Sequence, residues 1–266
     1  MELLCPICGE TLTKQEKSYR CGKNHSFDIA RQGHVNLLPV QQKRSLSPGD
    51  TAHQVAGRRA FLDGGFYDPI RQTLIALAKD HGCSGPILDV GCGEGYYSAG
   101  LAEALQTELL GLDISKEAVR YAAGRYKNAA WICASAARLP LKDQSVGLLT
   151  SLFALTMPKE FRRVLRPDGA FIQVLAAEDH LMGLKSIIYP ELYHKEKFTT
   201  PDIPGFRLEE SRKLQFAFTV EGTQVQNLLS MTPHVYRIGK EGAERLRQTE
   251  QLTDTASCVL NLYKPL

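Results

Sequence analysis

The sequence predicts an α/β protein with a doubly wound sheet, preceded by a small metal-binding domain. After residue 70, short apolar runs alternate with longer amphipathic stretches, as strands and helices do in βαβ units. Before residue 36, cysteine and histidine side chains recur at metal-ligand spacing. With 266 residues and 43% hydrophobic content, the chain can bury one large core and a small satellite.

The metal-binding motif runs from Cys5 to His25. Two residues separate Cys5 from Cys8 and three separate Cys21 from His25, so each pair fits a tight turn, and a hairpin between the pairs can bring them together. Four such ligands suit tetrahedral Zn²⁺ and leave no position for water, so we expect a structural zinc. A redox-active Cys-x-x-Cys is the alternative, but it leaves Cys21 and His25 unexplained.

The chain divides into three parts by pattern. We expect a zinc-binding domain at 1–36, a connecting helical segment at 37–78 and a cofactor domain at 79–266, with an irregular insertion at about 190–212. The expected strands are 86–90, 109–113, 130–134, 146–152, 170–175, 214–220 and 257–263, and the expected helices include 95–105, 115–127 and 224–231. Ser115 is placed to cap the second of these helices.

A glycine-rich stretch, LDVGCGEG, follows the first strand of the cofactor domain. Gly91, Gly93 and Gly95 allow a sharp turn with a ligand packed against the backbone, as dinucleotide loops also do. Asp89 lies inside the strand end, where a pyrophosphate loop has an apolar residue. Asp113 ends the second strand, where it can accept hydrogen bonds from ribose hydroxyls.

These residues resemble those of class I S-adenosylmethionine-dependent methyltransferases over about residues 85–176. The resemblance implies a Rossmann-like seven-stranded sheet, completed by the last two strands, and S-adenosylmethionine as methyl donor. NAD-dependent redox chemistry is the alternative. After the fourth strand, residues 154–158 read ALTMP, whereas methylases of exocyclic amines carry an Asn/Asp-Pro-Pro-aromatic loop. This difference argues against an exocyclic-amine acceptor.

The whole chain resembles the RlmA type of bacterial ribosomal RNA guanine-N1 methyltransferases. The matching stretches are CPICG at Cys5, VNLLP at Val35, PGD at Pro48, RAFL at Arg59, GCGEGYY at Gly91, HLM at His180 and MTP at Met231. The resemblance implies that the substrate is a guanine in a hairpin loop of 23S ribosomal RNA, and that Cys5, Cys8, Cys21 and His25 hold zinc. It also implies that Tyr67, Gly93, Glu94 and His180 lie at the cofactor, and it is compatible with a homodimer.

The proton acceptor for guanine N1 is the least defined part of the site. His180 follows the fifth strand at the carboxyl edge of the sheet, where ligands bind in this fold, so it is the candidate base. It can equally contact the methionine moiety or cap a helix. Asp28 and Asp50 are better explained by structural hydrogen bonds. Phe153, at the end of the fourth strand, is either a stacking surface for the base or part of the core.

Charge is distributed unevenly along the chain. Residues 1–60 contain nine Lys or Arg residues and five Asp or Glu residues, whereas the remainder contains 23 Lys or Arg and 24 Asp or Glu. The nine cations are Lys14, Lys17, Arg20, Lys23, Arg31, Lys43, Arg44, Arg58 and Arg59. Such a cluster indicates contact with a polyanion, with a solvated basic face as the alternative. The sequence contains neither an apolar run of spanning length nor a secretory signal, so we expect a cytoplasmic protein without membrane contact.

Two other functions remain open on the sequence alone. One is a small-molecule methyltransferase with a structural zinc knuckle, which gives no reason for the basic N-terminal quarter. The other is a zinc-ribbon RNA-binding protein with an inactive cofactor domain, which the intact glycines, Asp89 and Asp113 disfavour.

Overall fold

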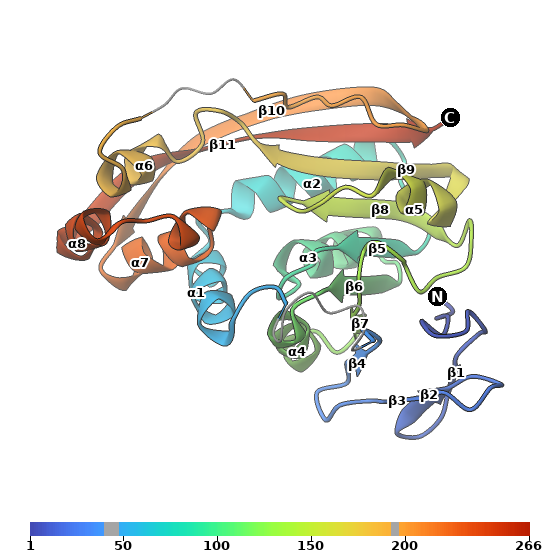
Figure 1. Cartoon of the computed structure of the whole chain (residues 1–266). Helices are drawn as coiled ribbons and strands as arrows, with labels where there is room; N and C mark the ends of the chain where they lie inside the picture. The colour runs from blue at the N-terminus through green and yellow to red at the C-terminus, as the bar shows by residue number, and fades with distance from the viewer. Residues whose placement is uncertain (40–47, 193–196) are drawn as a thin grey trace.

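The structure, a computed structural model, describes residues 1–39, 48–192 and 197–266. Its main feature is a large mixed sheet, which within these residues has eight strands (Figure 1). The strands are β4 (Val35–Asn36), β5 (Ile87–Val90), β6 (Leu109–Asp113), β7 (Ala130–Cys133), β8 (Val146–Leu152), β9 (Leu165–Ala176), β10 (Phe206–Glu221) and β11 (Gln251–Pro265). The helices are α1 (Ala52–Asp63), α2 (Asp68–Asp80), α3 (Tyr96–Leu105), α4 (Lys116–Arg125), α5 (Pro158–Val164), α6 (Met182–Ile188), α7 (Thr223–Ser230) and α8 (Lys240–Gln248), with a short 3-10 helix, η2 (Pro233–Tyr236).

The strand order is β10-β11-β9-β8-β5-β6-β7-β4. Neighbours from β9 to β4 are parallel, whereas β11 runs antiparallel to β9 and β10. The seven predicted strands are all present and form the expected Rossmann-like sheet. The eighth, β4, comes from the N-terminal part of the chain and pairs with the edge strand β7.

Four elements differ from the sequence expectation. The RPDG stretch at 166–169 has the composition of a turn, yet it lies inside β9, where the pairing is irregular opposite Gly147 in β8. Strand β10 begins at Phe206, before the predicted start at 214, because its exposed face carries charged side chains that hide the alternation. Helices α6 and α8 were not predicted; α8 is rich in charged residues and packs on α6 and α7 beyond one end of the sheet (Figure 1).

The predicted cap of α4 is present, and α1 has a cap that was not predicted. Helix α4 begins after Ser115, whose Oγ accepts from the Ala118 amide at 3.2 Å. Helix α1 begins with a capping box between Thr51 and Gln54. Among the described residues, no helix is both long and apolar enough to cross a membrane.

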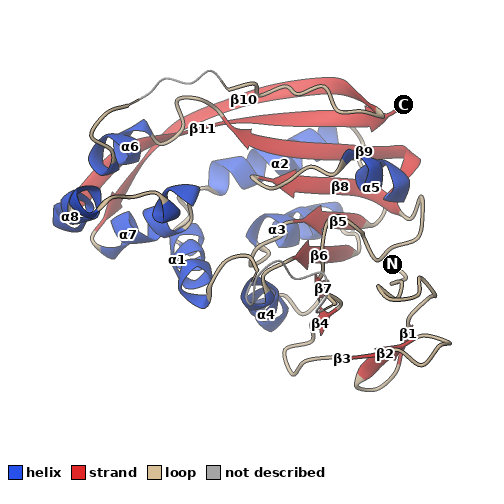
Figure 2. Cartoon of the chain, viewed as in Figure 1, coloured by secondary structure: helices blue, strands red, loops and turns tan. Residues whose placement is uncertain are grey.

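The two faces of the sheet bury separate hydrophobic clusters. Neighbouring strand residues alternate between them, with Ile87 in one and Leu88 in the other, as the two-residue period of a strand requires. The first cluster holds side chains of α2, α3 and α4, which Figure 2 shows along one side of the sheet. The second holds those of α5 together with apolar side chains of the N-terminal 37 residues.

The N-terminal part contains a small three-stranded sheet, β1 (Thr13–Lys14), β2 (Ser18–Arg20) and β3 (Ser26–Asp28). The N-terminal part packs against the main sheet in the place that a crossover helix between β7 and β8 would occupy, because residues 134–145 form no helix. An isolated bridge joins Leu3 to Leu141 in this connection, and the Leu37 amide donates to the Cys133 carbonyl at 2.8 Å. The metal-binding module therefore covers one face of the main sheet.

Candidate cofactor pocket and zinc site

The glycine-rich loop after β5 borders a cavity of about 570 Å³ at the carboxyl ends of the parallel strands. Gly91 and Gly93 line this cavity, and both have positive φ, +79° and +55°. A Cβ on Gly91 would lie 2.6 Å from the Cβ of Ala154, and one on Gly95 would lie 2.5 Å from the Trp131 ring. The loop therefore requires glycine at these positions, and its backbone can approach a ligand closely because no side chain intervenes.

Asp113, at the end of β6, faces the cavity with its carboxylate held by backbone amides. Oδ2 accepts from the Gly93 amide at 2.9 Å and Oδ1 accepts from the Ser115 amide at 2.7 Å. The Ser115 hydroxyl donates to the Asp50 carbonyl at 2.7 Å, which fastens the loop of residues 48–50 over the same edge. The remaining lone pairs of Asp113 are thus oriented for hydroxyl donors such as those of a ribose.

Two predicted cofactor residues lie beneath the loop and do not line the cavity. Asp89 is 2% exposed, accepts from the Thr150 hydroxyl at 2.7 Å, and has its pKa raised to about 6 by burial. Glu94 is 5% exposed and accepts from the Tyr96 amide at 3.3 Å; burial raises its pKa to about 7, although the charge of Arg58 opposes the shift. Both carboxyl groups hold the loop and its helix in place.

Part of the cavity wall could not be predicted from the sequence. The cavity is lined by the stretch 134–137 after β7 and also by the loop of residues 48–50 and by Leu155, neither of which was expected at the cofactor. Arg58 of α1 also lines it and pairs with Asp50. The Arg58 Nε is buried and has no hydrogen-bond partner in the described part of the chain. The PGD stretch at residues 48–50 was the sequence feature that could have indicated this part of the wall. Its position at the cavity depends on the contact between Asp50 and Ser115, which are 65 residues apart in the sequence.

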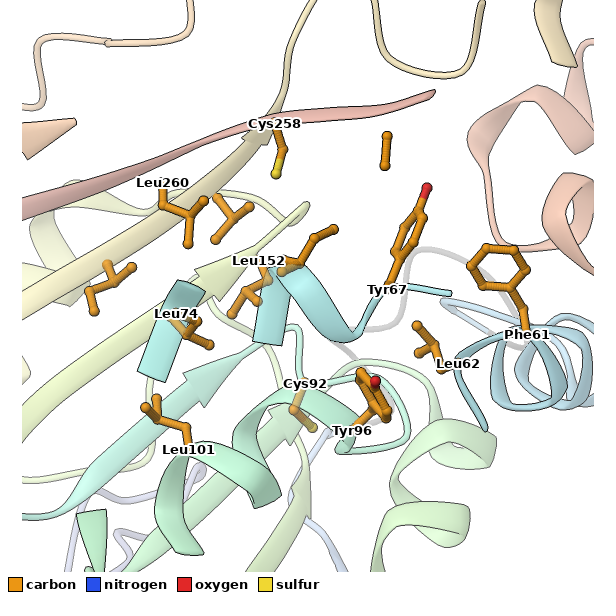
Figure 3. Packing of buried hydrophobic residues seen from close by; sticks show 14 of the residues in the cluster. Phe61, Leu62, Tyr67, Leu74, Cys92, Tyr96, Leu101, Leu152, Cys258 and Leu260 are labelled. Atoms are coloured by element: carbon orange, nitrogen blue, oxygen red, sulfur yellow. The ribbon is translucent and has the colours of Figure 1, made fainter. Parts of the chain in front are cut away.

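Phe153, Tyr67 and His180 meet beside the cavity. Tyr67 is 2% exposed and lies within the aromatic core (Figure 3). Its hydroxyl is 3.4 Å from His180 Nε2, while His180 Nδ1 accepts from the Ser257 amide at 3.1 Å. Phe153 lines the cavity, and its ring lies 6.2 Å from that of His180 with an interplanar angle of 28°.

His180 is held as a neutral imidazole. Burial, reinforced by the nearby charges of Lys197 and Lys185, lowers its pKa to about 4. Since Nδ1 accepts from a backbone amide, the single ring proton belongs on Nε2, facing Tyr67. Neither nitrogen is left to take a proton from a substrate in this arrangement.

The four predicted metal ligands come together in the N-terminal module. Their ligand atoms all lie within 4.8 Å of one another, with Cys8 Sγ 3.6 Å from Cys21 Sγ and His25 Nδ1 3.4 Å from Cys21 Sγ. A tetrahedral zinc site with bonds of about 2.3 Å has ligand atoms about 3.7 Å apart. Strands β1 and β2 supply the predicted hairpin between the pairs. The residues fit a zinc ion with four protein ligands and no open position.

Two family descriptions match the chain in the parts just described. Residues 3–46 match the zinc ribbon described as RlmA, N-terminal. Residues 87–169 match a methyltransferase domain, which covers the strands β5 to β8 and the cavity edge they form. The two matches agree with a structural zinc in the module and S-adenosylmethionine in the cavity.

Three curated relatives resemble the chain over 68% of its length or more. A Micromonospora griseorubida protein named as a 23S rRNA (guanine-N1)-methyltransferase is 40% identical over 203 residues, 68% of each chain. The 23S rRNA (guanine(748)-N1)-methyltransferase of Streptomyces fradiae is 38% identical over 68% of this chain and 66% of its own. YxjB of Bacillus subtilis, named like the first, is 28% identical over 92% of this chain and 90% of its own.

Among solved structures, a protein from Anaeromyxobacter dehalogenans described as a type II methyltransferase is similar in fold. Its TM-score is 0.51 at 22% sequence identity, over 71% of this chain and 95% of that one. This similarity supports the fold of the methyltransferase domain.

Replacing Cys8 with alanine should abolish stoichiometric zinc binding. Three ligands cannot close the tetrahedron, so the module should loosen while the cavity between β5, β6 and β8 persists. Metal analysis should give one zinc per wild-type chain and much less than one in the variant, with the affinity for S-adenosylhomocysteine within a few-fold of wild type. Cys83→Ala, which removes a half-buried thiol outside the cluster, is the control. Equal zinc content in Cys8→Ala and wild type would contradict the assignment.

Asp89 should make the protein less stable as the pH rises from 4 to 7. Its folded pKa of about 6 exceeds its ordinary value of 3.8, so the native state binds the extra proton in this window and loses that advantage above it. At about 1.4 kcal/mol per pKa unit, the loss approaches 3 kcal/mol. Asp89→Asn, which still accepts from Thr150, should gain stability relative to wild type between pH 4 and 7 in urea titrations. A constant difference would contradict the argument; the exposed Asp168→Asn is the control.

Proposed function

The chain belongs to the family of 23S ribosomal RNA (guanine-N1)-methyltransferases, and from this premise we propose that it methylates N1 of a guanine in a hairpin loop of 23S rRNA. The observation that carries the proposal is the combination of a zinc ribbon and a methyltransferase cavity on one sheet, matched at 40% identity by a relative of that name. S-adenosylmethionine is the methyl donor. A small-molecule acceptor has no observation in its favour.

The chemistry depends mainly on positioning. Guanine N1 becomes nucleophilic when its proton passes to solvent water. Its attack on the methyl group forms the nitrogen–carbon bond and breaks the carbon–sulfur bond, so the positively charged sulfonium becomes the neutral thioether of S-adenosylhomocysteine. Little charge therefore has to be stabilised at the sulfur, and the protein must hold N1 in line with the methyl group at about 3–3.5 Å. In the proposal, the methyl donor would be held by Asp113, Gly91 and Gly93. The carboxylate of Asp113 would accept hydrogen bonds from the ribose hydroxyls of the donor.

Phe153 is the proposed stacking surface for the target guanine. It follows the last residue of β8 and has φ of +52°, a conformation that costs a non-glycine residue about 1–2 kcal/mol. Its amide donates to the Val174 carbonyl at 2.9 Å, which fixes the backbone there. The ring is 40% exposed, so it is not a core residue, and it borders the donor cavity. A base extruded from a loop can stack on such a ring.

His180 is proposed as a positioning residue. Its ring lies against Phe153, and its two nitrogens face the Ser257 amide and the Tyr67 hydroxyl. An imidazole with a pKa of about 4 is a poor acceptor for the guanine proton at neutral pH. The same contacts favour a role for Tyr67 behind the acceptor position, supporting the cavity wall.

The zinc ribbon is the proposed RNA-recognition module. Its cations at positions 14, 17, 20, 23 and 31 are exposed, while Lys43 and Arg44 lie outside the described residues. The proposal divides the chain into a zinc-binding RNA-recognition domain at 1–36, a connecting segment at 37–78 and a methyltransferase domain at 79–266. It places the protein in the cytoplasm, with its rRNA substrate, and extends to a homodimer, which light scattering can test.

Methylation of 23S rRNA tests the proposed reaction directly. The protein is incubated with labelled S-adenosylmethionine and rRNA from a strain that lacks the gene, and the RNA is digested to nucleosides. Label should appear in 1-methylguanosine. Gly91→Val, whose side chain would collide with Ala154 and block the donor cavity, should transfer none. Label elsewhere, or in small molecules of a cell extract only, would contradict the proposal.

Removing the Phe153 ring should slow methylation without weakening donor binding. Stacking of a base on an aromatic ring is worth about 1–3 kcal/mol, so Phe153→Ala should lower kcat/KM for the RNA by about tenfold or more. Phe153→Tyr should retain most activity, and Phe153→Leu, which keeps apolar volume but has no aromatic face, should behave like alanine. Equal rates for the leucine and tyrosine variants would argue against stacking; calorimetry with S-adenosylhomocysteine checks the donor.

A further inference from the structure

A second cavity, of about 590 Å³, shares no lining residue with the cofactor cavity. Side chains from three segments line it: Gln32 from the zinc-binding module, Arg59 and Asp63 from α1, and Arg120, Tyr121 and Arg125 from α4. We call this cavity the arginine groove. Three guanidinium groups and one carboxylate give its lining a net charge of +2, although the whole chain carries only +3.

We propose that the arginine groove binds the phosphate backbone of the RNA strand next to the target guanosine. The inference rests on the proposed function and deepens it, because it places a main RNA contact on the methyltransferase domain, beside the zinc ribbon. Guanidinium groups bind phosphate oxygens through parallel N–H donors, and a concave site with several of them suits a polyanion.

The arginines of the groove are held in place but not saturated. Asp63 accepts from both Arg59, at 3.4 Å, and Arg125, and Arg120 pairs with Glu117 at 2.7 Å. The three side chains remain 42% to 49% exposed. The Arg120 Nε is buried without a hydrogen-bond partner in the part of the chain that the structure describes. Each guanidinium has five N–H donors, so most remain for a ligand.

Tyr121 fixes the spacing of the cations. The guanidinium carbons of Arg120 and Arg59 lie 5.2 Å and 5.8 Å from the centre of its ring, on two different helices. Cation–π contacts of this kind hold like charges near each other without neutralising them. Lys127 fastens the zinc-module side, since its Nζ donates to the Gln32 carbonyl at 3.2 Å and to the Ala123 carbonyl at 2.7 Å. The groove is therefore a fixed feature that spans the junction of the two domains.

The position of the groove relates it to the methyl-transfer site. Arg58 and Arg59 are consecutive residues of α1, yet the first lines the donor cavity and the second lines the groove. An RNA strand lying in the groove and crossing α1 would reach the edge where Phe153 and the donor loop meet. The exposed cations of the zinc ribbon would bind phosphates farther along the same RNA strand, away from the methyl-transfer site.

The test measures binding of the 23S rRNA hairpin that the wild-type protein methylates, by fluorescence anisotropy at several KCl concentrations. The double variant Arg120→Gln/Arg125→Gln should bind at least about tenfold more weakly near 0.1 M salt, and the slope of log Kd against log salt should fall by about 1 to 2. Arg247→Gln, which removes a comparable exposed arginine paired with Glu244 on α8, should match wild type.

Asp63→Asn provides the opposite test, which does not depend on a loss of binding. Removing the carboxylate that competes with phosphate for Arg59 and Arg125 should tighten RNA binding several-fold and leave the affinity for S-adenosylhomocysteine unchanged. Unchanged RNA affinity and salt slope in both groove variants would overturn the groove while leaving methylation by the wild type intact. Absence of 1-methylguanosine with the wild-type protein would instead overturn the proposed function itself.

Discussion

The rest of the structure depends on how the second face of the sheet is covered. A parallel sheet must bury both faces, yet residues 134–145 supply no crossover helix between β7 and β8. Apolar side chains of the N-terminal part cover this face of the sheet instead. They are Leu3, Leu12, Val35 and Leu37, each at most 5% exposed. At about 1.5–3 kcal/mol for each buried side chain, this packing outweighs the few hydrogen bonds of the two-residue strand β4. The zinc ribbon is therefore part of the core of the methyltransferase domain, and zinc fixes the part of the module that lies outside it.

This constraint relates the N-terminal part to the proposed RNA-binding features. Strand β4 pairs with β7 at the sheet edge, and the loop of residues 48–50 leads into α1. That loop contacts Ser115 at the donor cavity, and α1 contributes Arg58 to this cavity and Arg59 to the arginine groove. In the proposal, one continuous framework positions both the RNA substrate and the methyl donor. The strained backbone at Phe153 and the neutral His180 beside it form the proposed acceptor side.

The sequence was sufficient for the features that depend on local pattern. The metal ligands, the glycine-rich loop, Asp113 and the seven strands of the main sheet follow from spacing and periodicity, and the family resemblance extended them to the substrate. It was insufficient where residues far apart meet. The pairing of Val35 with Ile132, the contact of Ser115 with Asp50 and the approach of Arg59 to Tyr121 depend on tertiary packing. The exposure of the Phe153 side chain could not be predicted from the sequence either. An aromatic residue at the end of a strand gives the same sequence pattern whether it packs in the core or lines a cavity.

In the proposed complex, the zinc ribbon, the arginine groove and Phe153 hold one RNA hairpin with its guanine at the donor. A structure of the protein with its 23S rRNA hairpin and S-adenosylhomocysteine would test this arrangement. We expect backbone phosphates within hydrogen-bond distance of Arg120 and Arg125, the guanine extruded onto the Phe153 ring, and its N1 facing the sulfur. A hairpin bound to the outer surface of the zinc ribbon alone, with an empty groove and the guanine entering away from Phe153, would contradict it.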